Sequence, residues 1–202
     1  MKTITFGNKQ LMPSKIVCVG MNYAEHIKEL NSKAPSKLVI FNKPNSAISD
    51  KLFYINDNVR YESEISFLIN NNKIDGVGFG LDLTKADEQI SLKNNGHPWE
   101  RSKSFNRSAV FSEFVELNGD ITKLKLQLFI NDQLVQNGNH ELMIHKPQEI
   151  IKNVKGFMDF ENGDIIMTGT PKGVGYYKKN DEFVGKIYSG NDLLINKKWI
   201  VK

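Results

Sequence analysis

Two glutamates, Glu62 and Glu64, lie two residues apart in the stretch RYESEISFLI at residues 60–69. The alternation of apolar and polar residues there is typical of a β-strand, in which side chains two apart point to the same face. Two carboxylates on one face repel each other unless something neutralises them. Beyond Ser66 both faces of the strand are apolar, which favours burial of the pair.

A hard divalent cation would neutralise this pair, and Asp82 is a candidate third ligand. Mg²⁺ and Mn²⁺ take oxygen ligands and keep positions open for water and substrate. Asp82 ends the apolar, glycine-bearing stretch GFGLD, where an unpaired carboxylate would be costly. The alternative is a pair of glutamates on a solvent-exposed face, which is common in strands. Neither periodicity nor spacing shows that the two segments meet.

A second candidate for chemistry is His26 with Glu29, three residues apart in the predicted helix 22–30. Residues three apart are neighbours on a helix surface, and a carboxylate beside an imidazole fixes its tautomer and raises its basicity. The pair could act as a general base. The alternative is a solvated ion pair on a surface helix.

The segment TGTPKGVG at residues 168–175 follows an apolar strand and could bind an anion. Gly169 exposes backbone N–H groups and Thr170 adds a hydroxyl, which suits a carboxylate or an oxyanion. The spacing does not fit a phosphate-binding P-loop. The alternative is a tight loop that needs glycine only for its geometry. Lys103, in the polar segment RSKSF, is by default a solvated lysine.

These residues must be positioned by short elements. Asn22 and Thr84 are predicted to cap the helices that follow them, and Pro147 to lie in the first turn of another. Asn131 and Asp132 form the predicted turn of a hairpin. The remaining predictions are strands at 15–20, 37–44 and 60–69, a hairpin over 124–139, two or three C-terminal strands, and a short N-terminal hairpin within 1–14.

Many short strands, few short helices and no strict βαβ alternation predict a β-rich α+β fold. A length of 202 residues suits a single domain over 1–202. The net charge of +4 comes from scattered lysines, so no nucleic-acid-binding tail is indicated. No segment approaches the ~18 apolar residues of a membrane span. With a single cysteine, Cys18, and no apolar signal region, we expect a soluble, cytoplasmic protein.

In their order along the chain, six motifs resemble the landmarks of the fumarylacetoacetate hydrolase family. The similarity is to its small single-domain members of the acylpyruvate hydrolase/oxaloacetate decarboxylase type, and it runs from about residue 15 to the C-terminus. The resemblance implies a mixed β-sandwich roll, usually a homodimer, with Mg²⁺ or Mn²⁺ at its open end. The motifs are KIVCVGMNYAEHIKEL, FNKP, YESEISFLI, LDLTKAD, GHPWERSKSF and GDIIMTGTPKGVG.

The same resemblance implies a role for each matching residue. It makes the three acids the metal ligands and His26 with Glu29 the water-activating pair. It gives Lys103 the stabilisation of developing negative charge. The implied site is metal ligands Glu62, Glu64 and Asp82; catalytic residues His26, Glu29 and Lys103; and substrate contacts Thr170, Gly169, Gln89 and Lys43.

Two positions depart from the family pattern. Met21 precedes NYA where the smaller members often carry arginine, and Ala86 replaces a second arginine after the metal aspartate. Both arginines would face an anionic substrate, so their loss leaves the substrate open. Lys85 or Arg101 could compensate.

The implied substrate is a small anionic 2-oxo acid. The first hypothesis is hydrolysis of a carbon–carbon bond in an acylpyruvate, through an enolate held by the metal. Oxaloacetate decarboxylation or tautomerisation, and isomerisation of a 2-hydroxy-diene-dioate, use the same site. A non-catalytic protein that binds 2-oxo acids, and a structural β-domain with solvated carboxylates, are the alternatives from other classes.

Overall fold

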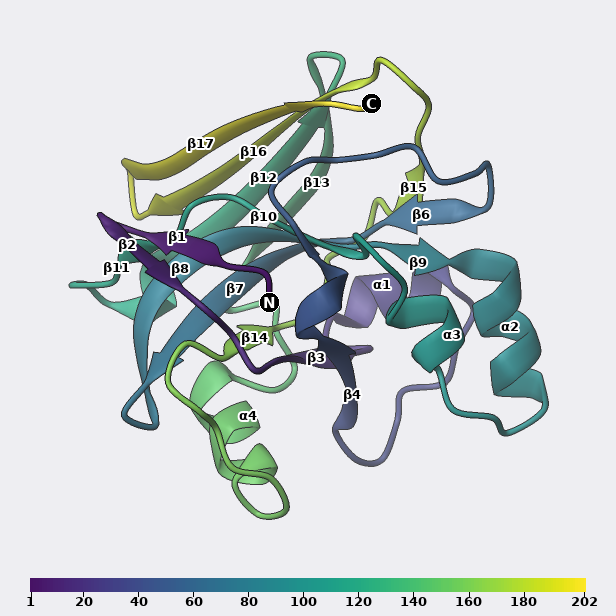
Figure 1. The fold of residues 1–202 in the computed structure, drawn as a ribbon. Helices are drawn as coiled ribbons and strands as arrows, with labels where there is room; N and C mark the ends of the chain where they lie inside the picture. Colours follow the sequence, from purple (N-terminus) through teal and green to yellow (C-terminus); the bar gives the residue numbers. More distant parts are fainter.

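Strand β7 (Ser63–Asn70), which carries Glu64, lies in the middle of the largest sheet. The computed structural model describes residues 1–202 (Figure 1). The largest sheet is mixed and has the strand order β4-β3-β14-β7-β8-β10-β5, and β11 also pairs with β8. Its other strands are β3 (Lys15–Gly20), β4 (Val39–Pro44), β5 (Ile48–Ser49), β8 (Lys73–Asp82), β10 (Ala109–Phe111), β11 (Val115–Glu116) and β14 (Ile165–Met167).

A second, antiparallel sheet of four strands packs across one face of the first, above it in Figure 1. The predicted hairpin over 124–139 is confirmed. Its turn residues Asn131 and Asp132 have φ values of 49° and 65°, as a type I′ turn requires. The strands, in the order β13-β12-β16-β17, are β12 (Leu124–Ile130), β13 (Gln133–Asn139), β16 (Glu182–Ser189) and β17 (Asp192–Ile200).

Two small sheets complete the strand structure. One is the N-terminal hairpin, and the other, ordered β15-β6-β9, brings the segment before Glu62 beside Thr84. Their strands are β1 (Ile4–Phe6), β2 (Lys9–Leu11), β6 (Val59–Tyr61), β9 (Thr84–Lys85) and β15 (Gly175–Tyr176).

The helices are short and few, as predicted. Helix α4 begins at Pro147, also as predicted. None of the helices has the length and apolar composition needed to cross a bilayer. The helices are α1 (Ala24–Glu29), α2 (Ala86–Asn94), α3 (Glu100–Lys103) and α4 (Pro147–Val154), with 3₁₀ turns at Asn45–Ala47 and Ile121–Lys123.

The predicted capping roles of Asn22 and Thr84 are wrong, because both side chains have stronger long-range partners. Tyr23 and Lys85 occupy the N-cap positions, and neither helix has a side-chain cap. The Asn22 amide donates to the carbonyl oxygen of Thr168 at 2.8 Å. The Thr84 hydroxyl donates to Glu62 at 2.7 Å. The side chains of Asn22 and Thr84 therefore hydrogen-bond to distant segments at the site and do not cap the helices that follow them.

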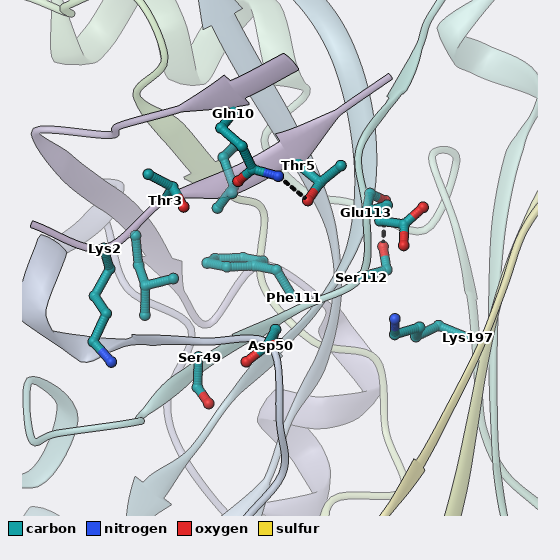
Figure 2. Close-up of a pocket in the computed structure, with 12 residues that line it drawn as sticks. Lys2, Thr3, Thr5, Gln10, Ser49, Asp50, Phe111, Ser112, Glu113 and Lys197 are labelled. Carbon is teal, nitrogen blue, oxygen red and sulfur yellow. Dashed lines mark hydrogen bonds between the residues drawn. The ribbon is translucent and has the colours of Figure 1, made fainter. Parts of the chain in front are cut away.

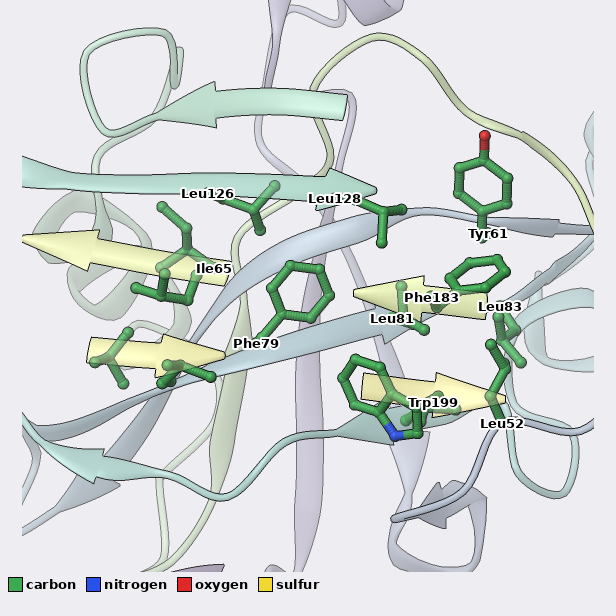
Figure 3. Close-up of a cluster of buried hydrophobic side chains, with 14 of the residues drawn as sticks. Leu52, Tyr61, Ile65, Phe79, Leu81, Leu83, Leu126, Leu128, Phe183 and Trp199 are labelled. Atoms are coloured by element: carbon green, nitrogen blue, oxygen red, sulfur yellow. The ribbon is translucent and has the colours of Figure 1, made fainter. Parts of the chain in front are cut away.

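The main hydrophobic core fills the space between the two large sheets (Figure 3). The Phe79 ring lies 5.9 Å from that of Trp199, measured between centroids. A Cβ at Gly185 would lie 2.7 Å from the Phe79 ring, so glycine lets β16 approach β8 closely. This core anchors β7 and β8, whose adjacent ends carry the acidic residues. Its inward-facing members include Ile65, Leu81, Leu126, Leu128 and Phe183.

The face of β3 and β14 that carries Ile16 and Ile165 packs against Ile4 of the N-terminal hairpin. Helix α4 covers the other face of these two strands, beside the main core, because Ile166 pairs with the core residue Phe67. Ile150 and Val154 pack there against Val17 and Ile166. Strands β3 and β14 are therefore buried on both faces, which explains the unbroken apolar runs in their sequences. The β-rich α+β prediction is confirmed (Figure 1). Glu64, at the beginning of β7, and Asp82, at the end of β8, lie at the same end of the large sheet.

Candidate active site

The structure brings Glu62, Glu64 and Asp82 together. Strands β7 and β8 are antiparallel neighbours, and Glu64 lies opposite Gly80, two residues from Asp82. One oxygen atom from each carboxylate lies within 4.8 Å of the others, and all three residues are buried. Strand register therefore creates the juxtaposition that periodicity alone could not show.

Lys103 joins two of these carboxylates. Its Nζ donates hydrogen bonds to Glu62 Oε2 at 2.9 Å and to Asp82 Oδ2 at 2.7 Å. The third hydrogen bond runs to the Thr84 hydroxyl at 2.6 Å. Every donor of the buried ammonium is used, so Lys103 is not the solvated lysine that its polar sequence suggested.

Lys43 lies beneath the same carboxylates and is completely buried. Its Nζ is 2.8 Å from Asp82 Oδ1, and it donates to the Ser108 hydroxyl at 2.9 Å, to Leu83 O at 3.3 Å and to the carbonyl oxygen of Lys103. Lys43 thus holds the Asp82 carboxylate and the backbone of the segment that carries Lys103 in place. In this structure it does not line the cavity where a substrate would contact it.

The three carboxylates fit a divalent cation. Asp82 Oδ1 is buried and accepts no hydrogen bond, because the donors of the nearby Lys43 ammonium point to other acceptors. Three carboxylates face two ammonium groups, so one negative charge is uncompensated when all are ionised. Hard oxygen ligands with an unsatisfied atom and excess negative charge are what Mg²⁺ and Mn²⁺ prefer.

The pKa values of the two glutamates are pushed apart. Burial raises the pKa of Glu62, but the Lys103 ammonium outweighs that effect and brings the pKa to about 2. Burial and the Asp82 charge raise the pKa of Glu64 well above its ordinary range, although the Gly169 N–H group opposes this. Glu64 is therefore the carboxylate whose ionisation would gain most from a nearby cation.

His26 and Glu29 form the predicted pair on α1. His26 Nδ1 lies 3.0 Å from Glu29 Oε2, and Glu29 Oε1 accepts a hydrogen bond from Gly173 N at 2.9 Å. An ionised carboxylate at Nδ1 places the imidazole proton there, which leaves Nε2 as the basic nitrogen. His26 is buried and lines the same cavity as the three carboxylates. The pair therefore spans the edge of the site, with His26 buried at the cavity and Glu29 exposed to solvent.

The glycine-rich loop 168–175 contacts the carboxylates directly. Gly169 N donates to Glu64 Oε2 at 2.7 Å. Gly169 has a φ of 93°, and a Cβ there would lie 2.8 Å from the Asn22 Cβ, so no larger residue fits without movement. The next residue, Thr170, lines the cavity beside Glu64. The loop therefore needs glycine for its geometry and also contributes polar groups to the site.

Gln136 is a functional residue that the sequence reasoning missed. It is buried on β13 and contacts both Thr170 and the backbone of Ser63, between the two glutamates. Its place in the predicted hairpin could have indicated it, because Gln136 lies opposite the buried Leu128. A polar residue at that inward-facing position needs hydrogen-bond partners.

The cavity beside the carboxylates is small, about 30 Å³. Lys93 lies at its lining, where its Nζ is 5.6 Å from the centre of the Trp99 ring. Burial and the charges of Arg60 and Lys103 lower the pKa of Lys93. The lining residues are Val19, Gly20, Met21, His26, Leu30, Phe41, Glu62, Glu64, Asp82, Gln89, Lys93, Trp99, Lys103 and Thr170.

The proposed replacements for the missing arginines lie elsewhere. Lys85 and Arg101 both pair with Glu88, at 3.6 Å and 3.1 Å, and neither lines the cavity. Gln89 does line it and accepts a hydrogen bond from Arg60 at 3.2 Å. Lys93 is thus the cation at the cavity whose ammonium makes no hydrogen bond or ion pair within the protein.

A larger concavity of about 370 Å³ lies near the N-terminal hairpin (Figure 2). Ser49 hydrogen-bonds with Lys51, and the Ser112 hydroxyl donates to the carbonyl oxygen of Glu113. Gln10 donates to Thr5. The hydroxyl groups of Thr5, Ser49 and Ser112 therefore take part in local hydrogen bonds. The side chains around this concavity do not converge as the ligands of an active site would.

The family model described as "Fumarylacetoacetate (FAA) hydrolase C-terminal" matches residues 15–192. An oxaloacetate tautomerase of Escherichia coli is 38% identical over 188 residues, covering 84% of this chain and 86% of that protein.

Two solved structures show the same fold. A putative fumarylacetoacetate isomerase/hydrolase from Oleispira antarctica has a TM-score of 0.93 and 34% identity, and the match covers 100% of both chains. A fumarylpyruvate hydrolase from Pseudomonas aeruginosa, solved in complex with Mn²⁺ and pyruvate, has a TM-score of 0.88 and 24% identity, over 100% of this chain and 96% of that one.

Proposed function

Because this chain belongs to the fumarylacetoacetate hydrolase family, we propose that it is a divalent-metal-dependent enzyme that interconverts the enol and keto forms of oxaloacetate. One observation carries the proposal: the buried acidic cluster, which has one carboxylate more than the two lysines beside it can neutralise, shares a cavity with His26, whose Nε2 is the basic nitrogen. The E. coli relative, named an oxaloacetate tautomerase, supports this choice of substrate.

Glu62, Glu64 and Asp82 would hold the cation, Mg²⁺ or Mn²⁺. When bound, the ion supplies Lewis-acid stabilisation of negative charge on substrate oxygens. The Mn²⁺ in the P. aeruginosa neighbour supports a divalent ion for this fold.

His26 is proposed to move the proton. Its Nε2 takes a proton from carbon 3 of the keto acid and delivers it to the oxygen on carbon 2, which gives the enol, and the reverse sequence restores the keto form. Glu29, 3.0 Å from Nδ1, stabilises the protonated imidazole between the two steps. The electron pair of the broken C–H bond becomes the C2=C3 π bond, the C2=O π bond is lost to the oxygen, and no σ bond other than those to the transferred proton is made or broken.

Lys103 and Thr170, which line the cavity, are proposed to stabilise negative charge on the substrate. Gly169 does not line the cavity, and its N–H group is already donated to Glu64, so its predicted substrate contact is replaced by a role in holding Glu64. The buried ammonium of Lys103 lowers the energy of negative charge that develops nearby. Gln89, held by Arg60, is proposed as a further polar substrate contact.

Hydrolysis of an acylpyruvate is the second candidate, and the oriented His26–Glu29 pair favours it. A cavity of about 30 Å³ accommodates a water molecule. His26 would remove a proton from that water, the hydroxide would attack the distal carbonyl, and the carbon–carbon bond would break to give a carboxylate and pyruvate. Decarboxylation of oxaloacetate at the same site would need no activated water.

The decisive experiment compares three reactions on one preparation. The chelator-treated protein is assayed with and without Mg²⁺ or Mn²⁺ for loss of enol-oxaloacetate absorbance, for pyruvate release from oxaloacetate and for cleavage of acetylpyruvate. We expect metal-dependent loss of the enol to be the fastest. Metal-dependent cleavage of acetylpyruvate with no tautomerisation would favour the hydrolase. No metal-dependent turnover of either compound would contradict an enzymatic role on these acids.

Two further expectations accompany the proposal. We propose that the chain forms a homodimer and acts in the cytoplasm on a small anionic 2-oxo acid. Light scattering coupled to size-exclusion chromatography tests the first, and a mass of about twice the 23.0 kDa chain is expected.

A further inference from the structure

Gln136 hydrogen-bonds to two segments of the active site, although it does not line the cavity. Its Oε1 accepts a hydrogen bond from Ser63 N at 2.9 Å. Its Nε2 donates to the Thr170 hydroxyl and to the carbonyl oxygen of Pro171, both at 2.8 Å. The residue is 1% exposed. One carboxamide therefore ties the strand carrying the acids to the glycine-rich loop.

The orientation of this carboxamide is determined by its partners. A backbone N–H group can only donate and a backbone carbonyl can only accept. Ser63 N must therefore face the Gln136 oxygen, and the Pro171 carbonyl must face its nitrogen. The reversed amide would place an acceptor against the Pro171 carbonyl and a donor against Ser63 N.

This orientation determines what the Thr170 hydroxyl can do. Its oxygen already accepts a hydrogen bond from Gln136 Nε2, so the Thr170 O–H group must donate elsewhere. Its one acceptor within the protein, the Pro171 carbonyl, is 3.4 Å away, which is longer than an ordinary O–H···O hydrogen bond. Thr170 lines the cavity, so the remaining direction for its O–H group is toward a ligand there.

We propose that Gln136 is a positioning residue that makes the Thr170 hydroxyl a hydrogen-bond donor toward an anionic oxygen of the substrate. The inference rests on the proposed function for the identity of the substrate. Its geometric basis, the fixed carboxamide, is independent of which reaction follows.

Gln136 also affects the distance between the acidic cluster and Thr170. Ser63 lies between Glu62 and Glu64, and Gly169 of the loop donates to Glu64 at 2.7 Å. Gln136 therefore sets the separation between the acidic cluster and Thr170, and it does so from a third strand. A substitution at Gln136 should therefore change the affinity of a ligand that contacts both the acidic cluster and the Thr170 hydroxyl.

The test uses the isosteric substitution Gln136→Glu. The new carboxylate can still accept from Ser63 N, but it also accepts from the Thr170 hydroxyl and so turns that proton away from the cavity. We expect oxalate, measured by calorimetry on the Mn²⁺-loaded protein, to bind about tenfold more weakly, as the loss of one hydrogen bond to a charged group implies. Mn²⁺ affinity should change by less than about threefold. The KM for oxaloacetate should rise more than kcat falls.

A double-mutant cycle with Thr170→Val distinguishes positioning of the Thr170 hydroxyl by Gln136 from a general disturbance of the structure. Thr170→Val should weaken oxalate binding as much as Gln136→Glu does, and the double variant should be no weaker than either single variant. Thr170→Ser, which keeps the hydroxyl, should bind oxalate like the wild type. Gln136→Met, which cannot donate, replaces Gln136→Glu in the cycle if the latter does not fold.

Unchanged oxalate affinity in the Gln136 variants, or additive losses in the double variant, would overturn the inference. Failure of the proposed function looks different, because wild-type protein would then bind oxalate and Mn²⁺ but turn over none of the 2-oxo acids.

Discussion

Lys103 and Asp82 form a buried ion pair, with the lysine Nζ 2.7 Å from Asp82 Oδ2. The same ammonium lies 2.9 Å from Glu62 Oε2. Burial lowers the pKa of Lys103, but the two carboxylates outweigh that effect and raise it above the ordinary lysine range. Lys103 therefore stays charged and holds two proposed metal ligands in place, while Glu64 lacks such a partner.

Glu64→Gln should abolish metal-dependent activity. The amide oxygen can still accept from Gly169 N, so we expect the fold to be kept, but the neutral group is a poor ligand for Mg²⁺ or Mn²⁺. Calorimetry should show at least a ~10-fold loss of Mn²⁺ affinity, a scale set by metal-site substitutions. The matched control, Glu116→Gln on exposed strand β11, should bind Mn²⁺ like the wild type. Equal affinity in both variants would remove Glu64 from the metal site.

His26→Ala should separate metal binding from catalysis. We expect Mn²⁺ affinity close to that of the wild type, because the imidazole is assigned to proton transfer and not to the cation. Tautomerisation and any acetylpyruvate cleavage should fall about 10²–10⁴-fold, as removal of a general base typically causes. The exposed His97→Ala variant is the control for loss of an imidazole. Full activity in His26→Ala would rule out the proposed base.

Lys93→Met should reduce selectivity for substrates with a second carboxylate. Lys93 makes no ion pair within the protein and lies at the cavity lining, so the distal carboxylate of oxaloacetate is its expected partner. We expect its KM for oxaloacetate to rise about tenfold, or about 1.4 kcal/mol, while KM for acetylpyruvate changes little. Lys85→Met, which removes a cation paired with Glu88, should leave both values unchanged. The opposite pattern would restore Lys85 as the compensating residue.

Asp164 should contribute stability that disappears in acid. Burial raises its pKa, but hydrogen bonds from Lys15, Glu161 and Ser14 outweigh burial and lower the pKa. A lowered folded-state pKa means that the contribution is complete above the unfolded pKa, about 3.9, and is lost as pH falls through the folded value.

Asp164→Asn should therefore destabilise the protein by about 1–3 kcal/mol at pH 7 in urea unfolding. The difference from wild type should shrink when unfolding is repeated below about pH 4. The exposed Asp159→Asn variant, with the same charge change, should stay within about 0.5 kcal/mol of wild type at each pH. A pH-independent difference would show that the carboxylate charge of Asp164 is not the cause.

The acidic cluster could be proposed from sequence because alternation places Glu62 and Glu64 on one face and Asp82 ends an apolar strand. Their meeting depends on the pairing of β7 with β8, which local patterns do not specify. The hairpin over 124–139 was predictable, because its turn residues and its alternation agree.

Other features depended on contacts between distant segments. Asn22 and Thr84 have the residue types of helix caps, but tertiary partners take their side chains. Lys85, Arg101 and Lys93 have similar chemistry in the sequence, and only the fold decides which one reaches the cavity. Long-range register and side-chain direction therefore limited the sequence analysis more than residue type did.

Glu29 uses one oxygen to orient His26 and the other to hold Gly173, which is 144 residues away along the chain. The proposed base is therefore held on both sides only after the segment around Gly173 has docked. During refolding from urea, recovery of activity should lag behind the formation of α1 and coincide with arrival of the 168–175 segment. A nascent chain that ends before this segment would carry the acidic cluster and the histidine, but not the tether that joins the helix to the loop.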